Sequence, residues 1–234
     1  MKPVSINNVH IYPFKDYNDA ISYVENNKGI LVAVNAEKIL HATDQTRKVI
    51  NNNIGYPDGV GAVWALKKKG INSVKRIPGV ELWLHIIRKY YKTNSFYLVG
   101  STKDVINITV NKLKNEFFGI NILNFRDGFI KNKEEKKELL DDIKKKKPDI
   151  VFVAMGSPRQ ELIMQEMYKI HPAIYQGLGG SFDVYAGKVK RAPKVWQQFN
   201  LEWLYRWYKQ PLARTKRNLQ LTKFIYYLYF NKFQ

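Results

Sequence analysis

The chain has 234 residues, of which 45% are hydrophobic, and it contains no cysteine. This length supports one sizeable core, or one domain with an appendage. The lack of cysteine excludes a disulfide framework and a thiolate metal site, as in a protein of the reducing cytosol. Residues 1–5 lack the apolar stretch of a secretory signal, and no apolar run reaches the roughly 18 residues of a membrane span.

The formal net charge of +19 predicts an anionic partner, such as nucleic acid, anionic lipid or a phosphorylated substrate. The charge is uneven: residues 188–234 hold eleven Lys and Arg but one acidic residue, Glu202. The same segment holds twelve aromatic residues, including three of the five Trp. We therefore expect an α/β core over residues 1–193 and a basic, aromatic, helical appendage over residues 194–234.

Short apolar runs predict the strands of the core. An alternating run predicts an edge strand at 4–11, and continuous apolar runs predict buried strands at 29–34 and 95–99. Further strands are predicted at 121–125, 149–154 and 173–176. Helical patterns lie between them at 16–25, 43–51, 60–66, 80–91, 104–117, 134–147 and from about 160 to 171. Strands that alternate with helices indicate a Rossmann-like fold with a mostly parallel sheet flanked by helices.

The segment Tyr56-Pro57-Asp58-Gly59 joins a polar run to an apolar helical pattern. Pro57 restricts the backbone, and the glycine allows a tight turn and the close approach of a ligand. Asp58 therefore lies on a rigid turn just before a helix. Two interpretations stay open: a helix N-cap, and a catalytic carboxylate.

Polar residues recur where predicted strands end and in other connections that can reach the same edge. Carboxyl ends of parallel strands are where open α/β sheets bind ligands. A strand, a glycine turn and a helix can also bind phosphate through the first amides of the helix. Each such residue has an ordinary alternative as a turn, cap or surface residue. The candidates are Asn35, Arg76, Gly100, Ser101, Gln160, Gly179, Gly180 and Asp183.

The sequence offers little metal or cofactor chemistry. It has no DxD motif, and its four histidines show no ligand spacing. A GxSxG motif, a P-loop and a GxGxxG dinucleotide fingerprint are all missing. An aspartate base with amides and arginines for phosphate remains, which suits transfer of a group from a nucleotide donor to a hydroxyl.

Several linked blocks resemble the signatures of the WecG/TagA/CpsF glycosyltransferases over about residues 5–220. The blocks are Asn35-Ala36-Glu37, Tyr56-Pro57-Asp58-Gly59, Arg76-Ile77-Pro78-Gly79, residues 155–161, residues 179–183, Arg191-Ala192-Pro193 and residues 203–206. The resemblance maps the family's proposed base onto Asp58 and its pocket Asn, Arg and Gln onto Asn35, Arg76 and Gln160. Members often carry Thr where this chain has Ala33, so contacts of that hydroxyl are not carried over.

The resemblance implies an inverting transfer of a sugar, N-acetylmannosamine or a related hexose, from a UDP-sugar without a metal or another cofactor. The implied acceptor is a polyprenyl-diphosphate-linked saccharide. Members act in the synthesis of wall teichoic acid, enterobacterial common antigen, or capsular and exopolysaccharides. The chain would then be cytoplasmic and peripheral at the inner face of the cell membrane.

The appendage combines cations with aromatic residues. Without a metal, amides and arginines must meet the diphosphate charge, and Arg206, Arg214 and Arg217 are candidates for this role. One helical stripe is expected to carry Trp196, Phe199, Trp203 and Trp207, followed by an aromatic cluster at 224–230. Such a stripe suits an anionic membrane surface, and it equally suits packing on the core.

Two rival functions follow from single features. The charge and aromatic residues alone would fit a basic nucleic-acid-binding protein, which the motif blocks disfavour and which we do not expect. A nucleotide-dependent oxidoreductase is disfavoured by the missing fingerprint. The sequence leaves the sugar, the acceptor and the oligomeric state open, a homo-oligomer included.

Overall fold

A computed structural model describes residues 1–209 and 211–230, without the side chains of 206 and 212–219. Its centre is a six-stranded sheet in the order β4-β3-β8-β7-β5-β6, in which every neighbouring pair is parallel. The strands are β3 (Gly29–Val34), β4 (Ile54–Pro57), β5 (Ser95–Gly100), β6 (Asn121–Arg126), β7 (Ile150–Ala154) and β8 (Ile174–Gly177). The predicted Rossmann-like α/β class is confirmed.

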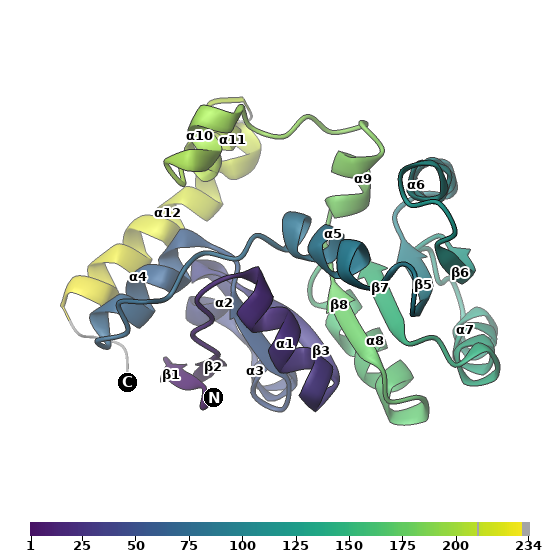
Figure 1. Ribbon diagram of the computed structural model, residues 1–234. Coiled ribbons are helices and arrows are strands. Elements are labelled where there is room, and N and C mark those ends of the chain that lie inside the picture. Colours follow the sequence, from purple (N-terminus) through teal and green to yellow (C-terminus); the bar gives the residue numbers. More distant parts are fainter. Residues whose placement is uncertain (210, 231–234) are drawn as a thin grey trace.

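Helices cover both faces of the sheet (Figure 1). One face packs against α1 (Tyr17–Asn27), α5 (Gly79–Tyr90), α6 (Lys103–Glu116) and α9 (Ser181–Tyr185). The other packs against α2 (Ala36–His41), α3 (Asp44–Asn51), α4 (Val60–Lys68), α7 (Lys133–Lys146) and α8 (Arg159–Ile170). The predicted helices agree with these bounds to within a few residues, whereas the short helices α2 and α9 had not been predicted.

The first predicted strand was wrong in form. Two three-residue strands, β1 (Val4–Ile6) and β2 (Val9–Ile11), form an antiparallel hairpin apart from the main sheet. Asn7 and Asn8 connect them with φ of 50° and 59°. Asparagine tolerates this left-handed region, and two such residues make the tight turn that suits a hairpin.

The strand β4 had been missed. It pairs only with β3 and so lies at the edge of the sheet, where Pro57, which has no N–H, is tolerated at the end of a strand. Gly55 also fits here for a steric reason, because a Cβ at this position would lie 2.4 Å from the carbonyl oxygen of His10. A four-residue strand that contains Gly and Pro carries no apolar run, so the local sequence does not predict it.

The connections leave adjacent strands in opposite directions. After β5 the chain crosses on the α6 face, and after β7 it crosses on the α8 face. Such a switch point opens a crevice at the carboxyl ends of the two strands, where ligands bind in open α/β sheets. Residues 100–101 and 155–159 border this crevice.

The C-terminal segment contains α10 (Lys194–Gln198), α11 (Glu202–Lys209) and α12 (Pro211–Tyr229). The single helical stripe that we expected is interrupted after α10, where Asn200 has φ of 60°. Helix α12 lies against α2 and α4 (Figure 1), and its Phe224 and Leu228 are buried in one core face. Packing on the core is therefore observed for these two residues. Other aromatic side chains of the segment are exposed, so contact with a membrane surface stays a prediction for them.

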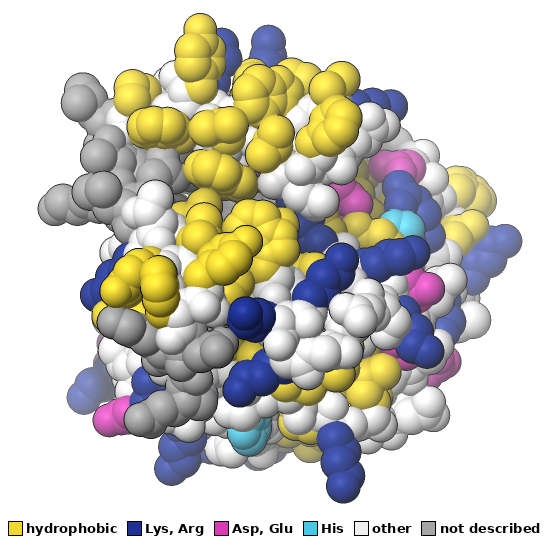
Figure 2. Space-filling model, turned by 90° about the vertical axis from the view of Figure 1, so that its left-hand side faces the viewer, with side chains coloured by type: hydrophobic (Ala, Val, Ile, Leu, Met, Phe, Trp, Pro, Cys, Tyr) yellow, Lys and Arg dark blue, Asp and Glu magenta, His cyan; other side chains and the backbone are white. Residues whose placement is uncertain are grey.

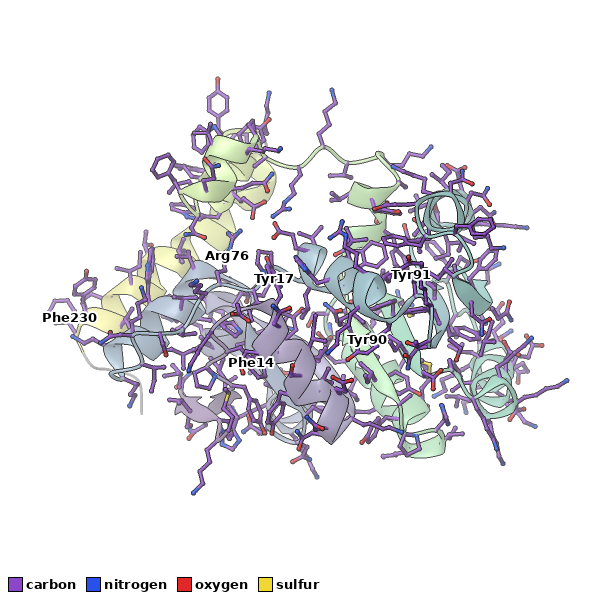
Figure 3. The ribbon with its side chains drawn as sticks, viewed as in Figure 1. Phe14, Tyr17, Arg76, Tyr90, Tyr91 and Phe230 are labelled. Carbon is purple, nitrogen blue, oxygen red and sulfur yellow. The ribbon has the colours of Figure 1, made fainter. Side chains whose placement is uncertain are left out.

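A buried carboxylate fastens α11 to the core. Glu202 pairs with Arg76 at 2.8 Å through one oxygen and with Arg191 at 2.8 Å through the other. Arg191 also pairs with Glu81 of α5 at 2.6 Å, and Glu81 accepts a hydrogen bond from the hydroxyl of Tyr17. We call these five residues the ion-pair cluster: Tyr17, Arg76, Glu81, Arg191 and Glu202. Tyr17 and Arg76 are labelled in Figure 3 and lie below α10 and α11.

Glu202→Ala should destabilise the protein by about 3 kcal/mol, since it leaves two mostly buried guanidinium groups short of a carboxylate. Urea unfolding measures this free energy, and limited proteolysis after residue 193 should become faster. Glu166→Ala is the matched control, because its ion pair with Lys136 is about 40% exposed and should contribute less than about 1 kcal/mol. Equal unfolding curves for Glu202→Ala and the wild type would contradict the anchoring role.

Candidate active site at the carboxyl edge of the sheet

The sequence-predicted residues of the core lie along one edge of the sheet. In the order of the strands, Asp58 follows β4, Asn35 follows β3, and Gly179 follows β8. Gln160 lies in the first turn of α8, which follows β7, and Gly100 is the last residue of β5. Five separate chain segments thus meet at the edge where parallel sheets bind ligands.

Asp58 is held between two backbone segments. Its N–H donates to the carbonyl of Val34 at 3.0 Å, and its carboxylate accepts the N–H of Gly79 at 2.6 Å. Gly59, not Asp58, is the N-cap of α4, so the capping interpretation is wrong for that helix. The carboxylate instead contacts the first residue of α5, where the positive end of the helix dipole favours an anion.

The surroundings of Asp58 tune its acidity. Burial raises the pKa of its carboxyl above the usual range, while the N–H of Gly79 and the charges of Arg76 and Lys38 counter part of this effect. A carboxylate with a raised pKa that is still partly exposed can take a proton from a bound hydroxyl. Asp58 is thus a carboxyl group with a raised pKa at the ligand-binding edge of the sheet.

A buried polar pair lies beneath Asp58, and we had not predicted its role. Gln176 in β8 donates to the hydroxyl of Tyr56 and to the carbonyl of Gly79, both at 3.4 Å. A Cβ at Gly79 would lie 2.7 Å from the hydroxyl of Tyr56, so a side chain there would displace the support of Asp58. Gln176 interrupts an otherwise apolar strand, and this polar residue was the one available signal.

Asn35 is the N-cap of α2, and its side chain accepts the N–H of Lys38 at 3.0 Å. The cap interpretation of Asn35 is thus confirmed. Asn35 also abuts the Asp58 loop, because a Cβ added at Gly59 would lie 3.0 Å from the Cβ of Asn35. The cap role and a place in the site are compatible, since the amide lies beside the loop that carries Asp58.

Gln160 and Glu161 form a buried network with Lys38. The side-chain oxygen of Gln160 accepts the N–H of Gly179 at 2.9 Å, and Glu161 pairs with Lys38 at 2.7 Å. Gln160 and Glu161 are both less than 5% exposed. The network ties α2, α8 and the glycine loop that contains Gly180. Lys38 and Glu161 had not been predicted, although Glu161 lies within one of the motif blocks.

The end of β5 approaches α9. Gly100 has φ of 145°, and a Cβ there would lie 2.4 Å from the carbonyl oxygen of Ala154, so only glycine fits without a backbone shift. The hydroxyl of the next residue, Ser101, donates to Asp183 at 3.1 Å. The structure thus brings Gly100, Ser101 and Asp183 together at the crevice between β5 and β7.

Other candidate residues are placed differently or lie outside the described set. Arg76 contacts Glu202 rather than open solvent, and its charge still acts on Asp58. The side chains of Arg206, Arg214 and Arg217 lie outside the described residues, so their expected role stays a prediction. Within residues 1–209 and 211–230, no three His, Asp or Glu side chains are grouped to hold a metal ion.

A cavity of about 850 Å³ lies beside β6, α6 and α7, away from this edge. Its lining includes Lys103, Asn124 and Arg126, and it contains none of the residues predicted for the site. The hydroxyl of Tyr97 and the amide of Asn124 both donate to Asp142 there, at 2.7 Å and 2.6 Å. The carboxyl edge next to Asp58, rather than this cavity, is therefore the candidate active site.

The fold and this edge define a Rossmann-like α/β protein with a carboxylate and glycine loops at its ligand-binding edge. The family model of the glycosyl transferases of the WecG/TagA/CpsF family matches residues 4–234. The chain therefore belongs to this family, which confirms the resemblance found in the motif blocks. It is a glycosyltransferase of cell-surface polysaccharide synthesis. Among the described residues, none of the helices has the length and apolar character needed to cross a membrane.

Asp58→Asn should leave the protein at least as stable as the wild type at about pH 8. A raised folded-state pKa means that the folded protein loses stability as the pH rises through that value, whereas Asn stays neutral and can still accept the N–H of Gly79. The advantage of the variant should vanish toward about pH 4, near the unfolded-state pKa of Asp. Urea unfolding at both pH values measures the difference.

Asp141→Asn is the control, because Asp141 is exposed. Its free energy of unfolding should stay close to that of the wild type at both pH values. An Asp58→Asn variant that is markedly less stable at about pH 8 would show that the carboxylate serves mainly to stabilise the start of α5.

Proposed function

We propose that this chain is an inverting, metal-independent glycosyltransferase in which Asp58 is the general base. The donor is a UDP-sugar, with N-acetylmannosamine or a related hexose as the sugar. The acceptor is a polyprenyl-diphosphate-linked saccharide. The protein works as a peripheral protein at the cytoplasmic face of the membrane, and it has no nucleic-acid partner.

The observation that carries the proposal is the setting of Asp58. The N–H of Gly79 orients its carboxylate, and burial raises the pKa of this group. The residue directly follows a parallel strand. Inversion in one displacement requires a base that takes the acceptor proton while the nucleoside diphosphate leaves from the opposite face of the sugar. Within the family fold, a single oriented carboxylate meets this need.

The rest of the edge is suited to the donor. The glycine turns at 100–101 and 179–180 present backbone close to the crevice, and Gly100 and Gly179 adopt positive φ. Backbone amides and cations can meet the charge of a leaving diphosphate in place of a metal. On this proposal Asn35 contacts the sugar, and the buried Gln160 acts on it through the Gly179 loop, whose N–H its side chain accepts. Ser101 and Asp183 lie on the nucleotide side.

The C-terminal helices support a membrane role. Val195, Phe199, Trp207 and Tyr208 of the α10–α11 region are 40% to 77% exposed. Figure 2 shows hydrophobic side chains gathered over α10 and α11, with Lys and Arg side chains on the same face. An exposed apolar patch beside cations is suited to an anionic bilayer surface.

Asp58→Asn should lower turnover by about 10²-fold to 10⁴-fold, the usual contribution of a general base. The assay offers a panel of UDP-sugars with a short prenyl-diphosphate N-acetylglucosamine acceptor, and isothermal titration measures UDP-sugar binding. We expect binding to be largely kept, because Asn retains the shape of Asp. Wild-type turnover in the variant would place the base elsewhere.

Phe199→Ser with Tyr208→Ser should reduce co-sedimentation with anionic vesicles by about tenfold, because two exposed aromatic side chains no longer enter the interface. Thermal unfolding should be unchanged, since both side chains are at least 70% exposed. Phe118→Ser is the matched control: this residue is 92% exposed but follows α6, away from the appendage. Equal sedimentation of wild type and double variant would exclude this membrane surface.

A further inference from the structure

A cleft lies beside Asp58, between the core and the C-terminal helices. One wall comes from α4 and the connection to α5, and the opposite wall comes from α10. Its volume is about 570 Å³, which is within the usual size of a small-molecule site. We call it the α4–α10 cleft. None of its lining was predicted from the sequence as part of a site, except Arg76.

The position of the α4–α10 cleft relative to Asp58 is the first argument. Val60, two residues after Asp58, lines it, and so does Pro78, which precedes the Gly79 that holds the Asp58 carboxylate. Because β4 is the edge strand, Asn35 and the glycine loops lie on the other side of Asp58. The base therefore stands between the carboxyl edge and the cleft.

The chemistry of the walls is the second argument. Val60, Val63, Val74 and Pro78 form the apolar part of the lining, and Val60 is the most exposed of them. Lys67, Lys75 and Lys194 give three ammonium groups, and none of these forms an ion pair with an acidic residue in the described part of the chain. The acid in the lining, Glu81, is already paired with Arg191. The cleft is thus cationic with an apolar wall.

We infer that the α4–α10 cleft binds the diphosphate and the adjoining prenyl units of the acceptor, with Lys67, Lys75 and Lys194 as the diphosphate ligands. This inference rests on the proposed function. A base must contact the acceptor hydroxyl on the face opposite the leaving group, so the acceptor has to approach Asp58 from the side away from the donor. Lysine binds phosphate as a point charge, and the apolar wall suits the hydrocarbon chain.

Because α10 forms one wall of the α4–α10 cleft, the C-terminal helices also take part in acceptor recognition on this inference. Lys194 and Gln197 belong to α10, so one wall exists only while these helices stay on the core. The ion-pair cluster holds them there, through Glu202 and its contact with Arg76. A ligand that emerges from an anionic bilayer would then meet the cleft beside the exposed aromatic side chains of α10 and α11 (Figure 2).

The test uses the full chain with Lys67, Lys75 and Lys194 all changed to Glu. All three residues are exposed, so the fold should be kept. The matched control changes Lys137, Lys144 and Lys145 of α7 to Glu, which alters the net charge by the same amount away from the cleft. Assays in detergent without vesicles separate this effect from binding to a membrane.

The triple cleft variant should raise the KM for a prenyl-diphosphate saccharide by about tenfold or more, because favourable charges become repulsive. The affinity for UDP and the KM for the donor should not change, and the α7 control should behave like the wild type. With a phosphate-free octyl glycoside of the same sugar, wild type and cleft variant should have equal KM values. An unchanged acceptor KM in the cleft variant, or an equal rise in the control, would overturn the inference.

A direct binding arm keeps the inference separate from the proposed function. Farnesyl diphosphate is titrated without any donor, with inorganic diphosphate and UDP as competitors. Binding by the wild type and the α7 control, lost in the cleft variant, supports the cleft even if no UDP-sugar is turned over. Displacement of farnesyl diphosphate by UDP would assign the cleft to the donor, and displacement by an equal concentration of inorganic diphosphate would exclude a role for the prenyl chain; either result overturns the inference.

Discussion

The carboxylate of Glu202 fastens α10 and α11 to the core by ion pairs, while α12 is held by the packing of Phe224 and Leu228. One oxygen pairs with Arg76 from the core and the other with Arg191 from the segment before α10, so one residue of α11 connects both sides. Glu202 is 9% exposed, and the pairing satisfies a charge that would be costly to bury alone. The charge of Arg76 also lowers the pKa of Asp58, so the same arginine takes part in attaching the helices and in setting the acidity of Asp58.

Asp58 shows how stability and function compete at one position. Burial raises its pKa, which means that the ionised form destabilises the fold, yet the role of general base that we propose for Asp58 requires the ionised form. The N–H of Gly79 and the cations Arg76 and Lys38 limit this cost without removing it. Tyr56 and Gln176 fix the backbone that carries Gly79, so part of the buried polar network beneath the sheet edge serves the orientation of one carboxylate.

Much of the fold followed from local patterns, because buried parallel strands read as apolar runs and helices as periodic ones. β4 did not follow, since an edge strand of four residues that contains Gly and Pro has no such run. The residues of the candidate edge could be predicted because they follow strands or lie in motif blocks. Lys38, Gln176 and Glu202 could not, because each is defined by a partner distant in sequence: Glu161, Tyr56 and Arg76, respectively.

The order of the strands gives the site its direction. Because β4 is at the edge of the sheet, the loop that carries Asp58 has the other strand ends on one side and α4 with α10 on the other. In the inverting displacement that we propose, the acceptor hydroxyl attacks the anomeric carbon of the donor from the face opposite the leaving diphosphate, and the base lies on the side of that hydroxyl. Because β4 is an edge strand, one side of the Asp58 loop is free of strand ends, and on this proposal that side admits the acceptor. On this proposal, the position of β4 at the edge places Asp58 between the donor at the strand ends and the acceptor in the α4–α10 cleft.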